Sequence, residues 1–218
     1  MQPKIASLIT EIDNVELIRD QIAAILRLEL DNQVALAQAE SVDPAPWTVD
    51  VYTERSGAFE SGLNDPNRKT PFVNVWIDNE SWDRSASNVM ERQRGNAFIN
   101  VDAVGYGTRK PGEAGDFEAA TSCQRVLRLC RKILMAAPYT YLELRGIVAS
   151  RWPQSRTYYQ PTIDQAPVQN VYGGRFTMVV DFNEFSPQTT PETLEVLAVQ
   201  LQRAETGEVY FDAEYNYT

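Results

Sequence analysis

The stretch that most constrains the fold is 95–137, where a strand pattern passes through a glycine-rich turn into a strongly periodic helix pattern. In 95–106 one set of alternate positions is apolar and consists of Ala97, Ile99, Val101 and Ala103. The other set is mixed and consists of Phe98, Asn100, Asp102 and Val104. This period of two predicts a half-buried strand. Apolar residues recur at helical spacing in 116–136, in a stripe of Phe117, Ala120, Leu127, Cys130 and Leu134. The helix needs an apolar partner, and the sheet is the available one.

A second helix is predicted near the N-terminus. Asp13 and Glu16 stand at capping-box spacing, with Asp in place of the usual Ser or Thr. The apolar residues that follow at helical spacing extend the pattern to about residue 39: Leu17, Ile18, Ile22, Ile25, Leu26 and Leu30. The same spacing in Ile5, Leu8, Ile9 and Ile12 allows a shorter helix before it.

Further strand patterns surround these helices. Alternation indicates strands at 47–52, 72–78 and 171–183, and strand-like content at 147–159 is broken by Pro153. The strands of 71–106 follow one another through a polar connection, which predicts an antiparallel pair. We therefore expect an α+β fold, with an antiparallel or mixed sheet and the two main helices packed on one of its faces.

The chain divides into one main domain and a C-terminal extension. Residues 1–186 form the predicted α+β domain, which contains a long polar loop at 55–71. Residues 187–218 form the extension, expected to pack on the same domain. Its pattern indicates a hairpin around 205–208, with a helix over 194–203 as the alternative.

Composition excludes several kinds of function. The net charge of −10 argues against a nucleic-acid-binding surface over the whole molecule. The chain has no histidine, which removes Ser-His-Asp and Cys-His catalysis and histidine metal sites. No apolar run approaches the ~20 residues that span a bilayer, and charges interrupt the N-terminal residues where a signal peptide is apolar. We expect a soluble protein made in a cytoplasm.

Three groups of residues resemble reactive sites, but each has a plainer interpretation. Cys123 and Cys130 are seven residues apart on one helix, about 10 Å, too far for a disulfide, and are expected to be buried thiols. The turn 105–115 has the glycine spacing of a P-loop, but Glu113 and Ala114 stand where Lys and Ser or Thr are required. The acidic groups Asp78, Glu80, Asp83 and Asp181, Glu184 lack the order of a calcium loop and are expected to be surface acids. No catalytic, cofactor or metal residues are assigned.

Two basic features are candidate contact sites. Arg125, Arg128, Arg131 and Lys132 recur on the side of the 116–136 helix opposite its apolar stripe. They form either a solvated face or a surface that meets an acidic patch on a neighbouring subunit. The loop 55–71 carries Phe59, Arg68 and Lys69, and is either a mobile surface loop or an arm that contacts a partner.

This order of elements resembles the tail terminator proteins of tailed bacteriophages. The likeness covers roughly residues 5–186 and is carried by PFVNVWIDNESWD, GNAFINVDAVGYGT, FEAATSCQRVLRLCRKILMA and GGRFTMVVDFNEFSP. It lies in the order and character of the elements, with no signature motif. The loop 55–71 and the tail after 187 make this chain longer than the smaller members of the family.

The resemblance implies a structural virion protein without catalytic residues or a cofactor. Copies would form a homohexameric ring on the last ring of the tail tube, stop its growth and join the tail to the head connector. Its partners would be itself, the tail tube protein, the connector or neck protein and, in a contractile tail, the sheath. Genomic DNA would pass through the lumen without specific binding, and no membrane would be involved. The protein would act in the virion after assembly in the host cytoplasm.

Three alternatives stay open. Another neck or tail-completion ring protein shares this pattern of elements. A small hydrolase or nucleotide-binding enzyme is disfavoured by the missing histidine and the defective glycine turn. A host adaptor or binding module would stay monomeric and bind no phage component.

Overall fold

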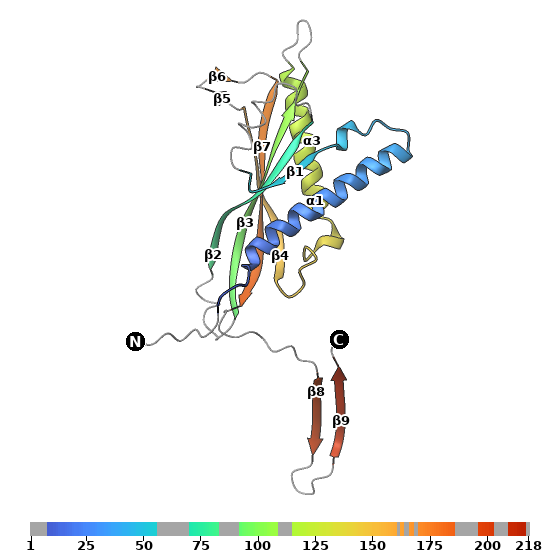
Figure 1. The fold of residues 1–218 in the computed structure, drawn as a ribbon, viewed down its shortest axis with the longest axis vertical. Helices are drawn as coiled ribbons and strands as arrows, with labels where there is room; N and C mark the ends of the chain where they lie inside the picture. The colour runs from blue at the N-terminus through green and yellow to red at the C-terminus, as the bar shows by residue number, and fades with distance from the viewer. Residues whose placement is uncertain are drawn as a thin grey trace, which may run out of the picture.

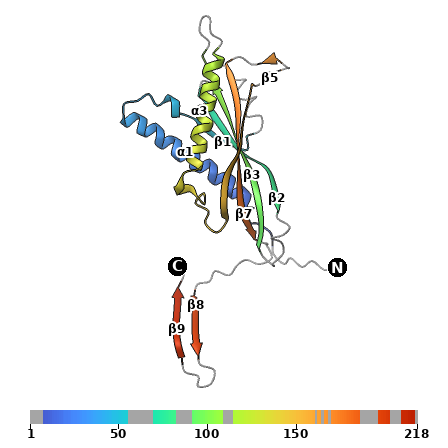
Figure 2. The same ribbon diagram turned by 180° about the vertical axis from the view of Figure 1, so that it is seen from behind.

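The computed structural model describes residues 8–55, 70–82, 92–108, 115–160, 162–163, 166–167, 170–185, 196–202 and 209–216. Its body has two layers, a five-stranded mixed sheet and two long helices (Figure 1). The helices, α1 (Asn14–Ala39) and α3 (Asp116–Leu134), share one apolar core with the sheet. The view from behind in Figure 2 shows the same arrangement. The α+β prediction is therefore confirmed.

The sheet is centred on the strand that the sequence predicts at 95–106. Its strand order is β1 (Asp50–Thr53), β2 (Phe72–Trp82), β3 (Arg92–Tyr106), β7 (Val171–Phe185) and β4 (Val148–Tyr159). The pairs β2–β3, β3–β7 and β7–β4 are antiparallel, as predicted for the first of them. The pair β1–β2 is parallel, which makes the sheet mixed.

The central strand is more buried than predicted. Its apolar set is fully enclosed beneath the helices, as expected. Asn100, Asp102 and Val104, on the opposite face, are also buried, so the half-buried prediction was wrong. Neighbouring strands supply the cover: Val104 packs with Phe72, and Asp102 is held by Arg175. Long strands that are flanked on both sides can bury polar groups when those groups have hydrogen-bond partners.

The first helix begins and ends where the sequence predicts, but its N-terminus is capped differently. Asp13 is the N-cap residue, yet its side chain makes no capping hydrogen bond. Instead the backbone N–H of Asn14 donates to Oε2 of Glu184, from the end of β7, at 2.8 Å. Residues 8–13 are not helical, so the shorter helix is absent from the described part of its range, and Leu8 and Ile12 are exposed there.

In the second helix, α3, most residues of the predicted apolar stripe are buried, as expected. Its buried residues are Ala119, Cys123, Val126, Leu127, Cys130 and Leu134. Both cysteines are free and buried, as predicted. Phe117 is an exception, because 86% of it is exposed. It lies in the first turn, and the prediction that it belongs to the core was wrong.

Two strand boundaries also differ from the prediction. Trp47 lies in a short 3-10 helix (Ala45–Trp47), and the strand begins only at Asp50. Pro153 does not break β4, whose pairing register shifts between Pro153 and Ser155. A strand at the sheet edge tolerates proline because one of its sides needs no ladder hydrogen bonds.

Short elements complete the described chain. They are a 3-10 helix (Ala137–Tyr139) and two strand pairs, β5 (Thr162–Ile163) with β6 (Ala166–Pro167) and β8 (Val196–Gln202) with β9 (Val209–Asn216). The pair β8–β9 is antiparallel and forms a sheet of its own, so the extension contains the predicted hairpin and not the alternative helix. Its packing on the main domain stays a prediction.

Candidate interaction surfaces

The basic face of α3, formed by Arg125, Arg128, Arg131 and Lys132, lies opposite the buried stripe of the helix, and Arg125 at its edge also lines a cleft with Tyr106. Arg128 and Lys132 are exposed, and Arg125 and Arg131 are half-buried. Within the described ranges none of the four forms an ion pair. Arg131 and Lys132 stand in the last turn, where cations favour the helix dipole. That role explains two of the four charges and leaves Arg125 and Arg128 without one.

A glycine sets the depth at which α3 lies on the sheet. A Cβ atom at Gly105 would lie 2.4 Å from the carbonyl oxygen of Ala119 and 2.4 Å from the backbone nitrogen of Cys123. The helix backbone therefore rests directly on β3, with Cys123 and Leu127 against the sheet. Because residues on a helix repeat every 3.6 positions, this seating turns the basic face outward.

The C-terminal end of α3 is held by an arginine from β4. Arg151 donates from Nε to the carbonyl oxygen of Leu134 at 2.6 Å, from Nη2 to that of Ala136 at 2.8 Å and from Nη1 to that of Thr140 at 2.7 Å. The carbonyl of Leu134 ends the helix and has no intrahelical donor, whereas that of Ala136 also accepts from the backbone N–H of Tyr139 at 3.1 Å. Partial burial lowers the pKa of Arg151. Sequence reasoning missed this residue, since nothing local connects it to α3.

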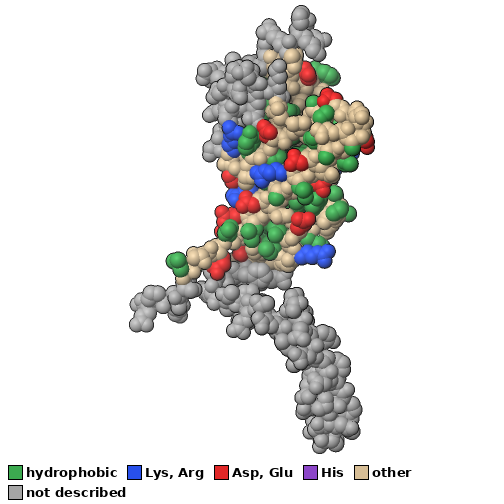
Figure 3. Space-filling view, turned by 45° about the vertical axis from the view of Figure 1, so that its right-hand side comes forward, with side chains coloured by type: hydrophobic (Ala, Val, Ile, Leu, Met, Phe, Trp, Pro, Cys, Tyr) green, Lys and Arg blue, Asp and Glu red, His purple; other side chains and the backbone are tan. Residues whose placement is uncertain are grey.

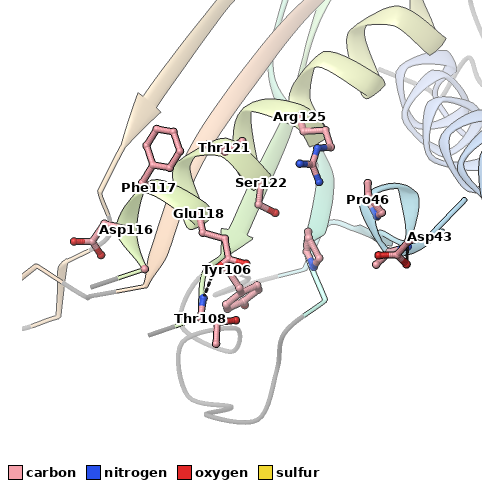
Figure 4. A pocket seen from close by; sticks show the side chains of 13 residues that line it. Asp43, Pro46, Tyr106, Thr108, Asp116, Phe117, Glu118, Thr121, Ser122 and Arg125 are labelled. Carbon is pink, nitrogen blue, oxygen red and sulfur yellow. Dashed lines mark hydrogen bonds between the residues drawn. The ribbon is translucent and has the colours of Figure 1, made fainter. Parts of the chain in front are cut away.

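A cleft of about 880 Å³ lies at the N-terminal end of α3. Arg125, Ser122 and Glu118 extend from the helix toward Tyr106 and Thr108, whereas Phe117 points away (Figure 4). The Oε2 atom of Glu118 accepts a hydrogen bond from the backbone N–H of Thr108 at 2.8 Å.

The charge of this cleft disfavours a phosphate ligand. Among the residues that the structure describes, its lining contains the carboxylates of Asp43, Asp116 and Glu118 and one guanidinium, that of Arg125. Residues 109–114, which include most of the glycine turn, lie outside the described residues. Asp116 stands in the first turn of α3, as predicted, where its charge favours the helix dipole.

A second charged surface lies where α1 begins. It is the acidic end, formed by Asp13, Glu16, Glu80 and Glu184. These residues come from the start of α1, the end of β2 and the end of β7. Partial burial, followed by the nearby carboxylates of Asp13, Glu184 and Glu16, raises the pKa of Glu80. Figure 3 shows acidic, basic and apolar side chains interspersed on one face of the molecule.

The sheet face opposite the helices carries an internal polar network. Nε and Nη2 of Arg175 donate to the two carboxylate oxygens of Asp102 at 2.7 and 3.0 Å, and Trp76 Nε1 donates to the same carboxylate at 2.8 Å. The guanidinium of Arg175 lies 4.8 Å from the centre of the Trp76 ring. The hydrogen bond to Asp102 raises the pKa of Arg175. These charges satisfy one another, so this pair is structural.

A similar pair shows that one predicted surface acid is internal. Asp181 is 6% exposed and accepts hydrogen bonds from Arg94, so its assignment to the surface was wrong. Asp78 and Glu80 are exposed, as predicted, and Asp83 lies outside the described residues. Phe59, Arg68 and Lys69 also lie outside them, and their contact role stays a prediction.

Comparison with known proteins gives no match: no family model and no curated protein matches the sequence. In the part of the chain that the structure describes, no group of three or more Cys, Asp or Glu residues is arranged to hold a metal ion. Among the described helices none is both long and apolar enough to cross a membrane.

Proposed function

We propose that this chain is a structural virion protein, a tail terminator that forms a ring on the phage tail tube. The ring ends tube elongation and presents a face to the head connector. The observation that carries the proposal is the basic face of α3, whose cations form no ion pair within the described residues of a chain with net charge −10. Such segregation of charge favours contact between copies.

The order of elements supports the same class. α1, a first strand, a long connection, the antiparallel β2–β3 pair, α3 and then β4 and β7 follow one another in the order on which the resemblance rests. A ring requires contacts in which one surface meets a different surface of the next copy. The chain offers two such surfaces, because the basic face lies on α3 and the acidic end comes from α1, β2 and β7.

The proposed partners follow from this role. They are further copies of the chain in a hexamer, the tail tube protein, the connector and, in a contractile tail, the sheath. The acidic chain suits a DNA channel, because a negative wall does not hold the phosphate backbone as the DNA passes.

Electron microscopy of the purified protein mixed with tail tubes tests the proposal. We expect six-fold rings at one end of each tube, and a hexamer mass by light scattering. A monomer that leaves tubes uncapped would refute the terminator role. Rings that bind the connector but not the tube would favour the alternative of another neck or tail-completion protein.

The cleft beside α3 is the observation that would favour an enzyme or a small-molecule binder. Its Arg125, Ser122 and Thr121 side chains offer polar contacts. A thermal-shift screen with small carboxylates and nucleotides tests this alternative, with Arg125→Ala as the matched variant. A ligand that stabilises the wild-type chain but not the variant would support it.

A further inference from the structure

Two oppositely charged surfaces lie on different parts of the chain. In Figure 1, α3 covers the upper part of the sheet, and α1 begins near its lower end, where β2 also ends. The basic face belongs to α3. The acidic end is formed by the start of α1, the end of β2 and the end of β7. Asp13, Glu16 and Glu80 form no ion pair within the described ranges. Within the described residues, therefore, neither these three acids nor the cations of the basic face are paired directly with an opposite charge.

We propose that the acidic end of one copy docks on the basic face of α3 in the next copy. The inference rests on the proposed function, because it names the contact through which the ring forms. The two surfaces differ, so each docked pair of copies leaves one basic face and one acidic end free. Repeated pairing of this type closes into a ring when the rotation between copies divides a full turn.

The acidic end also offers an apolar anchor. Trp82 is 46% exposed. Its ring packs edge-on against that of Phe182, with 5.4 Å between the ring centres. Glu80 and Trp82 are two residues apart on β2 and so lie on the same face. Tryptophan and arginine are enriched where interfaces bind most strongly, and arginine stems cover apolar surface beside their charge. Arg125 and Arg128 of a neighbouring α3 could therefore contact both the apolar Trp82 ring and the carboxylates of the acidic end.

The local electrostatics of Glu80 favour an external cation. Although Glu80 as a residue is exposed, partial burial of its carboxylate and then the three further carboxylates nearby destabilise its charged form. Glu184 already serves the N-terminus of α1 through its bond with Asn14. A cation from a neighbouring copy would relieve the repulsion at Glu80, and Arg128 is an exposed candidate.

Charge reversal on each side tests the pairing. We expect Glu80→Lys and Arg128→Glu each to raise the dissociation constant of self-assembly at least tenfold, because each places like charges across the contact. An equal mixture of the two variants should regain assembly. When the two variants alternate around the ring, the two reversed residues face each other at one contact and the two native residues at the next, so every contact joins opposite charges. Sedimentation velocity measures the assembly, and native mass spectrometry shows whether the two variants alternate.

Matched controls separate this contact from general charge effects. Asp31→Lys on α1 and Arg156→Glu on β4 make the same charge changes at exposed positions outside both surfaces. We expect both controls to assemble as the wild type does. Denaturation curves check folding, and Glu80→Lys should be at least as stable as the wild type, because it removes like-charge repulsion.

The outcomes distinguish this pairing from the proposed function. If the wild type forms tube-capping rings but neither reversal weakens them, the pairing is wrong and the terminator role stands. If both reversals abolish assembly and the mixture does not restore it, these residues do not meet, and the pairing is again wrong. A wild type that remains monomeric with and without tubes refutes both.

Discussion

At the scale of single residues, long-range polar contacts complete what local structure leaves unfinished. Arg151 reaches from β4 to the last carbonyl oxygen of α3, and Glu184 reaches from β7 to the first N–H of α1. Each satisfies a backbone group that a helix end leaves without a partner. These contacts tie the helices to the sheet edge and to the end of its central strands.

Replacing Arg151 tests the first of these contacts. We expect Arg151→Met to lower the free energy of unfolding by about 2–3 kcal/mol, because it removes charge-assisted hydrogen bonds to three carbonyl groups. Urea denaturation measures the change. The control is Arg156→Met, at an exposed position of the same strand, which we expect to change stability by less than about 0.5 kcal/mol. Equal losses in the two variants would contradict the capping role.

The buried thiols of α3 make stability depend on alkaline pH. Burial raises the pKa of Cys123 and of Cys130 from 9.0 to about 12. The unfolded chain therefore loses these protons above pH 9 while the folded chain keeps them. The stability that the protonated thiols confer is complete below pH 9 and falls as the pH rises toward 12.

Cys130→Ala isolates one of these protons. We expect stability to fall less steeply with pH in the variant than in the wild type, by about 1.4 kcal/mol per pH unit between about pH 9.5 and 11. Urea denaturation at several pH values gives the slope, which is independent of any constant loss caused by the smaller side chain. Parallel slopes in the two proteins would show that Cys130 does not retain its proton on folding.

At the scale of elements, the seating of α3 on β3 determines which surfaces the domain presents. Gly105 allows the two backbones to touch, and the buried stripe of the helix then faces the sheet. The consequence is that the basic face is directed to solvent. Phe117 is left outside this contact because it projects from another side of the helix than Ala119, which lies in the same turn and is fully buried.

Gly105→Ala tests this seating. We expect a loss of about 1–3 kcal/mol in stability, because the new methyl group would overlap the helix backbone and force α3 away from the sheet. Gly146→Ala is the control, since its added Cβ has open space and carries only the cost of a left-handed backbone, about 1 kcal/mol. Chemical denaturation compares the two. A smaller loss at Gly105 than at Gly146 would argue against close contact.

At the scale of the whole molecule, the proposed contact places a basic surface of one copy against an acidic surface of the next, although every copy has a net charge of −10. The basic face and the acidic end lie on different elements, which suits a ring. Repulsion between the acidic chains opposes nonspecific association. The balance of these two effects should depend on ionic strength.

Self-assembly should therefore respond to salt. We expect the dissociation constant to rise on the order of tenfold between about 0.05 and 0.5 M NaCl, because salt screens the attraction between exposed charges. Sedimentation velocity at several salt concentrations measures it. The mixture of Glu80→Lys and Arg128→Glu should show the same dependence. Assembly that strengthens with salt would indicate a contact dominated by apolar burial.

The sequence alone determined the long helices, the main strands and most of their apolar faces. The alternation at 95–106 and 171–183 and the helical spacing after Asp13 and Asp116 are local patterns, so both long helices and the central strands were predictable. The basic face of α3 followed from the same periodicity. The predictions for Phe117 and Trp47 were wrong. Both residues lie at the end of an element, where lengthening the helix by a turn or the strand by a residue changes the local pattern little.

Only the tertiary structure decided how these elements meet. Parallel pairing of β1 with β2, the place of β7 between β3 and β4, and the acidic end depend on residues far apart in the chain. The burial of Asp102 and Asp181 likewise depends on Arg175 and Arg94, which lie 73 and 87 positions away. Periodicity records which face of an element is apolar, but it carries no information about which distant side chain will satisfy a polar one.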